Sequence, residues 1–392
     1  MRIIHLNPGT ADPNTANGVN KVVHWLATSM VAQGHDCEVW SLLETATPPS
    51  HPHTYKLETF ARTRSRFVLP SNLQAALSAL PKDTWVQLHS VFVPDLTSAA
   101  KLLRRNKIKF GITPHGGYLS EGEGSSFLSR VKKRLFLSLW EGWTPRHASL
   151  IHAIGQTEVE DLNRRFSSLP RIVLLPNGFG RESDQPSPLS DQTVHNLSIS
   201  QEDALTKLEP DIVYCGRMAT FQKGLNILLK GFALYRQSGG TLRLTMVGDG
   251  LDRPRLQILA RELGVEDAVT WTGKVFGASL HRLLRRATAF VHSSRFDVIP
   301  TACLEAASCG VPLLVSEETN LGSYVRRWNA GLILNPNTPS RLAEALKQIQ
   351  TLEPSDLAAM GASANEMIET DFTWSEITRR LLQAIEEERI RP

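Results

Sequence analysis

The chain has 392 residues, of which 41% are hydrophobic and 21% charged, with a formal net charge of +4. This length exceeds what one ordinary hydrophobic core accommodates and favours two domains, and the composition is that of a globular protein. A nucleic-acid-binding protein usually gathers far more Lys and Arg on one face, so the small charge argues against a nucleic-acid partner. An anionic small molecule or a membrane surface fits the mild positive excess better.

The amino terminus and the cysteines predict a cytoplasmic protein. The sequence opens with the strand-like Arg2–Leu6, which leaves no room for a signal peptide, and no apolar run approaches the roughly 18 residues that a membrane span needs. The four cysteines form no Cys-x-x-Cys pair and lie in no cluster with zinc-ligand spacing. We therefore expect reduced core thiols and no zinc site.

Short apolar runs alternate with helical patterns in the first half of the chain. Thr157 with Glu160 three positions later is typical of a capping box that opens a helix. Alternation of near-continuous apolar strands with helices indicates a parallel sheet covered on both faces. Strands are predicted at Arg2–Leu6, Asp36–Ser41, Trp85–Leu88, Lys109–Thr113, Leu150–Ile154 and Arg171–Leu175, and helices at Gly18–Gln33, Pro94–Asn106 and Ser125–Trp140.

The alternation lapses over Arg181–Glu209, a stretch rich in Ser, Asp, Gln and Pro that favours a linker or long loop. A second alternation follows, and the tail Ala343–Ile390 is mostly helical in pattern. We therefore predict an α/β protein with two doubly wound domains, 1–185 and 210–372, that face each other across a cleft and bind ligands at the carboxyl ends of their strands. The second set of strands is predicted at Asp211–Cys215, Thr241–Val247, Ala268–Trp271, Ala289–His292, Pro312–Val315 and Gly331–Leu334, and its main helices at Gly224–Arg236, Asp252–Leu263 and Thr301–Cys309.

Two acidic residues follow the predicted strand Ala289–His292. Asp297 lies in the loop before a helix, and Glu305 lies about one turn into that helix. Both can face a ligand at the helix amino terminus, where free N–H groups attract phosphate. The alternative is that Asp297 is an ordinary loop residue and Glu305 a solvated helix residue.

Two basic residues follow the predicted strand Asp211–Cys215. Arg217 stands at the strand end, and Lys223 opens the next amphipathic helix. A guanidinium and an ammonium group above the same sheet edge suit a diphosphate. A lone Arg or Lys is more often a solvated surface residue, but the pair shares its domain with Asp297 and Glu305.

The order of short motifs strongly resembles that of the retaining GT-B glycosyltransferases, a large family that includes sucrose-phosphate synthase and bacterial mannosyl- and glucosyltransferases. The resemblance is collinear over nearly the whole chain. It implies two Rossmann-like domains across a cleft, with a C-terminal helix at about 373–392 packed back on the first domain. The matching segments are Pro114–Gly116, Leu175–Gly178, Gly216-Arg217 with Lys223-Gly224, Val247–Gly250, Thr272–Val275, and Ser294–Asp297 through Leu304–Ala306 to Gly310–Pro312.

The resemblance implies a donor site in the second domain. Arg217 and Lys223 would hold the diphosphate of a nucleotide sugar, and Glu305 would bind the ribose hydroxyls. The loop at Lys274 and Val275 would meet the base. The turn before and into the helix would present backbone N–H groups to sugar and phosphate; it comprises Val298, Ile299, Pro300, Thr301 and Ala302, in which proline offers no N–H but is often seen in this family.

First-domain residues complete the implied site. Asn17 and Gly18 would bring backbone close to the phosphate, although Gly18 can also be a plain helix start. His115 would contact the donor sugar near the reacting carbon, and its place in Pro-His-Gly-Gly after a strand end favours this role over a structural one. Asp297 would be the second catalytic residue. The family usually has Glu at this position, so the shorter side chain changes the reach to a sugar hydroxyl and implies altered sugar selectivity or weak activity.

The implied reaction is front-face displacement through an oxocarbenium-like transition state. The leaving diphosphate would help to deprotonate the acceptor, and catalysis would depend on positioning and on electrostatic stabilisation. No Asp-x-Asp pair is present to carry a metal, so we expect Arg217, Lys223 and helix termini to replace it and no cofactor beyond the nucleotide sugar. The defaults of the family are UDP as carrier and glucose as sugar, with a glycan or lipid-linked acceptor in polysaccharide or glycolipid synthesis.

The segment Ser125–Trp143 mixes four basic residues with Phe, Leu and Trp. It can lie on an anionic membrane, such as the inner face of the cell membrane, that carries a lipid-linked acceptor. The alternative is a helix that packs on the first sheet and has a basic outer face.

Other functions stay open. The fold also occurs in sugar-nucleotide epimerases, and a degenerate transferase would act as a nucleotide-sugar or glycan sensor. A phosphorylase would need a pyridoxal-phosphate lysine site, for which the sequence gives no support. A dehydrogenase is disfavoured because Gly248-Asp249-Gly250 lacks the third glycine of the dinucleotide fingerprint.

Overall fold

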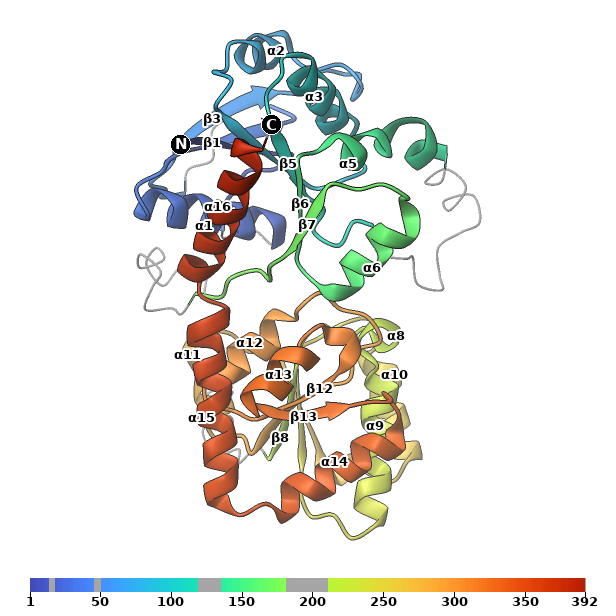
Figure 1. Ribbon diagram of the computed structural model, residues 1–392. Coiled ribbons are helices and arrows are strands. Elements are labelled where there is room, and N and C mark those ends of the chain that lie inside the picture. The colour runs from blue at the N-terminus through green and yellow to red at the C-terminus, as the bar shows by residue number, and fades with distance from the viewer. Residues whose placement is uncertain (14–17, 46–50, 119–134, 181–210, 392) are drawn as a thin grey trace. The chain divides into compact units, whose positions relative to one another are not determined.

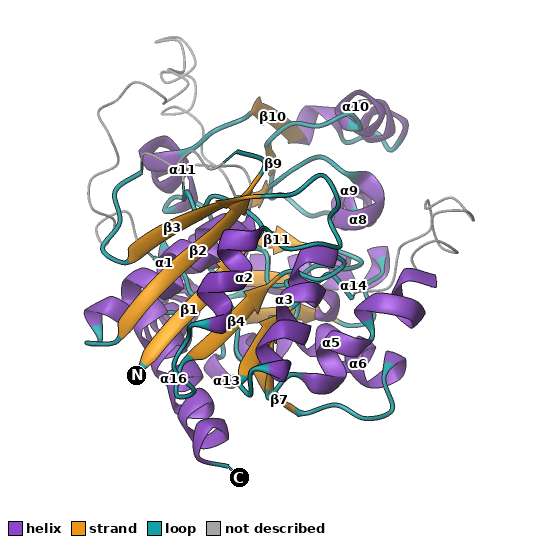
Figure 2. Cartoon of the chain, turned by 90° about the horizontal axis from the view of Figure 1, so that it is seen from above, coloured by secondary structure: helices purple, strands orange, loops and turns teal. Residues whose placement is uncertain are grey.

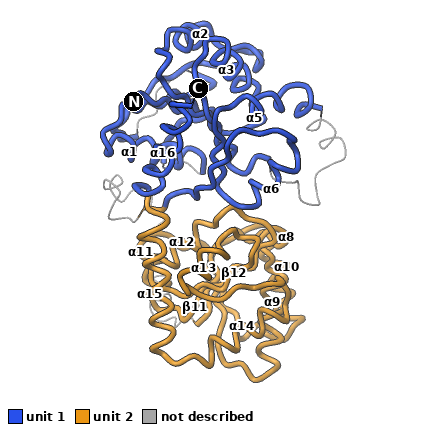
Figure 3. Tube along the Cα trace, in the orientation of Figure 1, with its two compact units in different colours: residues 1–178, 374–392 blue, residues 179–373 orange. Residues whose placement is uncertain are grey.

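The computed structural model describes residues 1–13, 18–45, 51–118, 135–180 and 211–391. The chain divides into two compact units, Met1–Gly178 together with Trp374–Pro392, and Phe179–Thr373 (Figure 3). The predicted linker at 181–209 falls outside the described residues.

Unit 1 is built on a seven-stranded sheet in the order β3-β2-β1-β4-β5-β6-β7, and every neighbouring pair is parallel. The strand order reverses between β1 and β4, which is the topological switch point of a doubly wound sheet. The central strands are buried along their whole length because helices cover both faces. The strands are β1 (Arg2–Asn7), β2 (Asp36–Leu43), β3 (Lys56–Ala61), β4 (Trp85–His89), β5 (Phe110–Thr113), β6 (Leu150–Ala153) and β7 (Arg171–Leu174). Figure 2 labels β1 to β4 and β7 of this sheet.

Residues at the helix ends of unit 1 stabilise the helices locally. In α3, Pro94 occupies the first turn and Arg104 and Arg105 lie in the last, which suits the helix dipole. Helix α16 lies beside α1, and its buried side chains share one apolar cluster with those of α1 (Figure 1). The helices are α1 (Gly18–Ala32), α2 (Ser71–Ser78), α3 (Pro94–Arg105), the π-helix η1 (Leu137–Glu141), α5 (Trp143–His147), α6 (Gln156–Arg165) and α16 (Trp374–Ile390).

Unit 2 has a six-stranded parallel sheet in the order β10-β9-β8-β11-β12-β13, with its switch point between β8 and β11. Two doubly wound parallel sheets confirm the predicted α/β fold class. The strands are β8 (Ile212–Cys215), β9 (Leu244–Val247), β10 (Val269–Gly273), β11 (Ala289–His292), β12 (Leu313–Ser316) and β13 (Gly331–Leu334).

The helices of unit 2 cover both faces of this sheet and form two apolar clusters with it. Helix α14 shows local capping, because Thr338 accepts a hydrogen bond from the Arg341 N–H at 3.3 Å and Pro339 starts the helix. The helices are α8 (Thr220–Lys223), α9 (Leu225–Gln237), α10 (Arg253–Glu262), η3 (Glu266–Ala268), α11 (Gly277–Leu284), α12 (Thr301–Ser308), η4 (Glu317–Thr319), α13 (Gly322–Trp328), α14 (Pro339–Thr351) and α15 (Pro354–Asp371).

Three local features of the structure differ from what the sequence predicted. Strand β3 and helix α2 were not predicted, because β3 is an edge strand with mostly half-buried side chains and α2 is short and mostly polar. The capping box at Thr157 is wrong: the N-cap is Gly155, which makes no side-chain cap bond. The helix starts at Gln156, and Glu158 in its first turn accepts the Ile154 N–H at 2.9 Å. The predicted helix Ser125–Trp140 lies partly outside the described residues.

Candidate functional site

The carboxyl ends of β8 and β11 meet at the switch point of unit 2, where doubly wound sheets bind their ligands. Arg217 follows β8 on an exposed turn, and its Nη2 donates to Gln222 Oε1 at 2.9 Å. The Tyr214 hydroxyl donates to the Arg217 carbonyl at 3.0 Å and holds the turn in place. The exposed guanidinium therefore keeps further N–H donors available to a ligand.

Lys223 reaches the switch point because a glycine follows it. Gly224 adopts φ = 62°, and a Cβ on it would lie 1.9 Å from the Ser293 carbonyl oxygen, a residue just past β11. Only glycine allows this close approach together with a left-handed backbone. The short helix α8 therefore ends against the end of β11 and directs the Lys223 ammonium group to the following loop.

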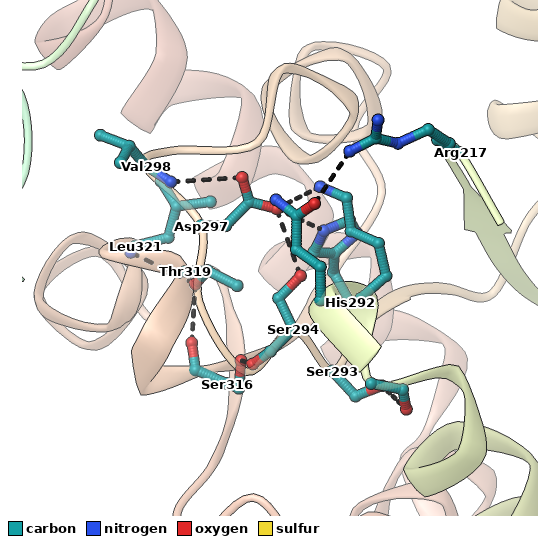
Figure 4. Close-up of polar contacts among 12 residues, drawn as sticks. Arg217, His292, Ser293, Ser294, Asp297, Val298, Ser316, Thr319 and Leu321 are labelled. Atoms are coloured by element: carbon teal, nitrogen blue, oxygen red, sulfur yellow. Dashed lines mark hydrogen bonds and ion pairs between the residues drawn. The ribbon is translucent and has the colours of Figure 1, made fainter. Parts of the chain in front are cut away.

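The Asp297 carboxylate is the centre of the polar cluster in this loop (Figure 4). Its Oδ2 forms an ion pair with Lys223 Nζ and lies 3.3 Å from His292 Nε2. The Ser294 hydroxyl donates to the same oxygen at 3.2 Å, and the Val298 N–H donates to Oδ1 at 3.2 Å. The structure thus joins the predicted Lys223 and Asp297 directly, through a residue set that includes two groups not predicted, His292 and Ser294.

Burial and charge act in opposite directions on Asp297. Burial raises the pKa of its carboxyl group, but the hydrogen bond from His292 and the charge of Lys223 outweigh this effect and lower the pKa to about 2. Burial lowers the pKa of His292, which lies between the rings of Tyr214 and Phe290. At neutral pH the cluster therefore holds an ionised Lys223–Asp297 pair beside a neutral imidazole.

The backbone after Asp297 forms a strained turn. Ile299 adopts φ = 50°, which is uncommon for a β-branched residue. Its N–H donates to the Thr319 carbonyl at 3.2 Å, while the Asn320 side chain donates to the Asp297 carbonyl at 2.6 Å. The N–H groups of Val298 and Ile299 are thus engaged within the protein.

Helix α12 supplies the remaining N–H groups of the predicted set. Pro300 is its N-cap, and Thr301 and Ala302 form its first turn, where N–H groups lack helical acceptors. Glu305, one turn later, accepts from His281 Nε2 at 3.0 Å. In the described residues no hydrogen bond joins Glu305 to Asp297, so the two carboxylates occupy separate parts of the site.

A pocket of about 670 Å³ opens at the carboxyl ends of β8, β9 and β10. Its size is typical of small-molecule sites. The backbones come close there, because a Cβ on Gly248 would lie 2.0 Å from the Gly216 carbonyl oxygen. Burial and the charge of Glu305 raise the pKa of Cys215, which lines the pocket, to about 12. The pocket brings together Arg217, Lys274 and Val275 of the predicted site; its lining is Cys215–Arg217, Val247–Leu251 and Lys274–Phe276.

His115 lies in unit 1, in the turn after β5. It adopts φ = 53°, and the N–H of the next residue, Gly116, donates to Glu158 Oε1 at 2.6 Å. Its Nε2 lies 3.0 Å from Nδ1 of His89 at the end of β4. Burial lowers the pKa of His115 to about 3, so its imidazole is neutral. Glu158 and His89 were not predicted.

Of the other predicted first-domain residues, Gly18 is exposed at the start of α1, and a Cβ on it would meet nothing within 4 Å. Packing within unit 1 therefore gives no reason for a glycine at this position. Asn17 lies outside the described residues.

The segment Ser125–Trp143 is described only from Leu135 onward, so its four basic residues are outside the described part. The described part carries exposed apolar side chains at Leu135 and Leu139. Phe67, also exposed, packs edge-on against Trp140 at 4.9 Å between ring centroids. No helix in the described ranges is long and apolar enough to cross a membrane, and the same ranges contain no group of three or more His, Cys, Asp or Glu arranged to hold a metal ion.

Comparisons with known proteins bear on both halves of the chain. Residues 198–367 match the family model described as glycosyl transferases group 1, and residues 17–178 match that of the glycosyl transferase 4-like domain. Glycogen synthase of Mycobacterium tuberculosis is 22% identical over 95% of this chain and 91% of its own length.

Two solved structures extend the comparison to the fold. The structure of Anabaena HepE in complex with UDP matches 99% of this chain and 100% of its own, with a TM-score of 0.71 and 17% identity. Sucrose-phosphate synthase from Thermosynechococcus elongatus matches 99% of both chains, with a TM-score of 0.67 and 18% identity.

Proposed function

The chain belongs to the group 1 glycosyl transferases and has their GT-B fold, and on this premise we propose that it is a retaining, metal-independent hexosyltransferase. The donor is a nucleoside-diphosphate sugar, with UDP as carrier and glucose as the default hexose. The acceptor is a glycan or a lipid-linked glycan in polysaccharide or glycolipid synthesis.

One observation carries the proposal: Arg217 and Lys223 converge on the switch point of unit 2, beside a pocket of ligand size. An exposed guanidinium and a positioned ammonium group match the two phosphates of a diphosphate. Two cations at this position supply the charge stabilisation that a divalent ion supplies elsewhere, which supports a metal-independent reaction.

Each residue of the cluster then has a task in the proposed reaction. Arg217 and Lys223 stabilise the negative charge that grows on the leaving diphosphate. Asp297, ionised and fixed by Lys223, accepts a hydrogen bond from a hydroxyl of the donor sugar. The free N–H groups of Thr301 and Ala302 face the phosphate at the start of α12. His115 accepts a hydrogen bond from the sugar near the reacting carbon.

The nucleoside half of the donor occupies the pocket. Lys274 and Val275 meet the base, and Glu305 binds the ribose hydroxyls near Cys215. Phe276, 62% exposed at the rim, offers an aromatic face on which a base can stack. Binding of UDP by Anabaena HepE supports a uridine nucleotide as the first ligand to test.

A lipid-linked acceptor is supported by the exposed apolar side chains of unit 1. Leu135 and Leu139 of the segment Ser125–Trp143 are exposed, and so is Phe67, which packs against Trp140 of the same segment. We expect the protein to bind anionic liposomes, which represent the inner face of a membrane. Neutralisation of the four basic residues should abolish this binding. Equal binding by wild type and the neutralised variant would remove the membrane from the proposal.

Calorimetric titration with UDP, GDP, ADP and CMP, each with magnesium and with chelator, tests the donor site. We expect one diphosphate to bind equally with and without metal, and Arg217→Ala to weaken it about tenfold or more, which is roughly 1.4 kcal/mol. Arg261→Ala, which removes an exposed arginine of α10 paired with Glu266, is the matched control and should leave the affinity unchanged. Binding only with magnesium would refute metal independence, and no binding by folded protein would refute the donor site.

Product analysis separates transfer from the other activities of this fold. Proton NMR of the product of UDP-glucose should show a new glycosidic bond with the α-configuration of the donor retained. A β-linked product would refute retention. Free sugar or an epimer formed without acceptor would indicate an epimerase, and binding without any turnover would indicate a sensor.

A further inference from the structure

Three histidines form a continuous chain across the sheet of unit 1. His5 lies on β1, His89 ends β4 and His115 follows β5. His5 Nδ1 lies 2.8 Å from His89 Nε2, and His89 Nδ1 lies 3.0 Å from His115 Nε2. These distances are those of hydrogen bonds, so His89 in the middle of the chain contacts His5 through one ring nitrogen and His115 through the other.

The chain is closed to water at its inner end. His5 and His89 are 0% exposed, and burial lowers the pKa of both imidazoles far below neutrality. A neutral imidazole has one N–H donor and one acceptor nitrogen. Each contact between rings needs one of each, so the protonation of one ring determines that of all three.

The inner end of the chain sets this direction. His5 Nε2 lies 3.2 Å from the sulfur of Met30. A thioether sulfur accepts hydrogen bonds and never donates them. His5 Nε2 therefore carries the proton, and its Nδ1 accepts from His89 Nε2. By the same rule His89 Nδ1 accepts from His115 Nε2.

We propose that Met30, His5 and His89 hold His115 in the neutral form protonated at Nε2, so that its Nδ1 lone pair is a dedicated hydrogen-bond acceptor for a hydroxyl of the bound sugar. His5 and His89 are then positioning residues. The role at the sugar rests on the proposed function, whereas the protonation pattern is a property of the free protein. In the described ranges no group of the protein is hydrogen-bonded to His115 Nδ1.

A second row of hydrogen-bonded polar groups in the same sheet likewise has its proton positions fixed by the groups at its ends. The Trp85 indole, a donor only, binds Gln87 Oε1 at 2.9 Å, and Gln87 Nε2 binds the Thr113 hydroxyl at 2.9 Å. That hydroxyl lies 3.4 Å from His152 Nδ1, and His152 Nε2 lies 3.0 Å from the Leu175 carbonyl, an acceptor only. Because the Leu175 carbonyl can only accept, His152 Nε2 carries the proton. His152 therefore serves as an internal reference for a neutral histidine protonated at Nε2.

The proposed form of His115 suits an oxocarbenium-like transition state. A neutral acceptor adds no positive charge beside a carbon that becomes positive, whereas an imidazolium would repel it. The backbone supports the same geometry, because Glu158 accepts the Gly116 N–H and anchors the left-handed turn at His115. A lone pair held ready in this way needs no reorganisation when the sugar binds.

Nitrogen-15 solid-state NMR of the free protein, labelled at its 12 histidines, tests the protonation pattern. Each ring nitrogen is identified through its bonded carbon, and the difference between wild type and His115→Gln isolates the signals of His115. We expect a lone-pair signal at Nδ1 and an N–H signal at Nε2 between pH 6 and 8, as for His152. The reverse assignment, or an imidazolium, would overturn the proposal.

Met30→Leu tests the sulfur without opening a large cavity, since leucine and methionine have similar volumes. We expect His115 to become a mixture of the two neutral forms. Unchanged His115 signals in this variant would show that the sulfur does not set the direction of the chain.

Two substitutions of His89 connect the chain to the reaction. His89→Asn places an amide oxygen where Nδ1 accepts from His115, and His89→Leu removes the acceptor. With UDP-glucose as donor, we expect kcat to fall about tenfold or more for His89→Leu, which is roughly 1.4 kcal/mol, and to recover for His89→Asn, with UDP affinity unchanged in both. Equal kcat in the two variants would refute the positioning role. The expected NMR pattern without any effect of His115→Gln on transfer would refute only the sugar contact.

Discussion

The two units share one topology but differ in the charge at their switch points. In unit 1 a chain of neutral imidazoles runs from His5 within β1 past the end of β4 to His115 after β5. In unit 2 the ends of β8 and β11 carry the ionised pair of Lys223 and Asp297. The fold thus determines where polar groups gather, and their surroundings determine whether they are charged.

Exposure to water explains the difference. His5 and His89 are 0% exposed, while the side chains of Lys223 and Asp297 are each 14% exposed. A fully buried group gives up its charge, whereas a partly hydrated pair with hydrogen-bonding neighbours keeps it. In the proposed reaction the charged pair of unit 2 has a use, because Lys223 meets the anionic diphosphate.

The largest expected effect is the unfolding of unit 1 in acid. Burial lowers the pKa of His152 from an ordinary 6.5 to about 4, so the unfolded chain binds more protons between these values. The contribution of His152 to the free energy of unfolding is present in full above pH 6.5 and is lost as pH falls through 4. The loss amounts to about 3 kcal/mol for this residue alone. Hydrogen exchange resolved by peptide, at pH 7 and pH 4.5, should show earlier opening of unit 1 than of unit 2.

Unit 2 provides the contrast within the same experiment. The pKa of Asp297 is lowered to about 2, so its contribution is present above the ordinary value near 4 and is lost only as pH falls through 2. Glu141 opposes the trend in unit 1, because burial raises its pKa to about 7 and its stabilisation is lost as pH rises through 7. Burial also lowers the pKa of His292 in unit 2, but unit 1 holds a larger set of such imidazoles, so equal protection of both units at pH 4.5 would contradict the neutral-imidazole description; the set in unit 1 includes His5, His89, His115 and His152.

Gly224→Ala sharpens the comparison from the side of unit 2. A left-handed alanine costs about 1–2 kcal/mol, and the clash with the Ser293 carbonyl adds about 1–3 kcal/mol. The substitution also moves Lys223, so UDP affinity should fall together with the midpoint of urea unfolding. Gly239→Ala is the matched control, because Gly239 has φ = 89° and open space around it. Equal losses in the two variants would show that the close approach to Ser293 has no special importance.

Lys223→Ala separates the ion pair from the ligand site. Loss of one charge-assisted bond to phosphate is worth about 1.5–3 kcal/mol, which is roughly a 10- to 150-fold weaker affinity for UDP. The variant also leaves Asp297 without its cation, so its unfolding free energy should fall. Addition of Asp297→Asn should restore stability but not UDP affinity. Recovery of affinity in the double variant would mean that Lys223 serves only to neutralise Asp297.

Much of the fold was predictable because the central strands are short, apolar and regularly spaced. The strand Ala289–His292 was predicted with the bounds that the structure gives. The edge strand β3 was not, because the alternation of Lys56–Ala61 resembles a surface loop when the neighbouring strand is unknown. Its pairing with β2 depends on tertiary contacts that no local pattern reveals.

The site was predicted in part for the same reason. Arg217, Lys223 and Asp297 stand in local motifs at strand ends, so their types and spacing revealed them. His292 and His89 end buried strands, where a histidine resembles a core residue until its partners are known. Glu158 and Met30 act through residues 42 and 25 positions away. Such pairs exist only in the folded chain and leave no signal in a single sequence.

Asp297→Glu is expected to have the smallest effect on binding and the clearest effect on selectivity. The added methylene keeps the charge that faces Lys223 and His292, so UDP affinity should change by less than about threefold, or about 0.7 kcal/mol. The carboxylate would reach farther toward the donor sugar, and relative kcat/KM values for UDP-glucose, UDP-galactose and GDP-mannose should change. Asp297→Asn is the control for charge, because it removes the ion pair at constant length. If glutamate lowers UDP affinity as strongly as asparagine does, Asp297 acts on the phosphates through Lys223, and its proposed contact with the sugar fails.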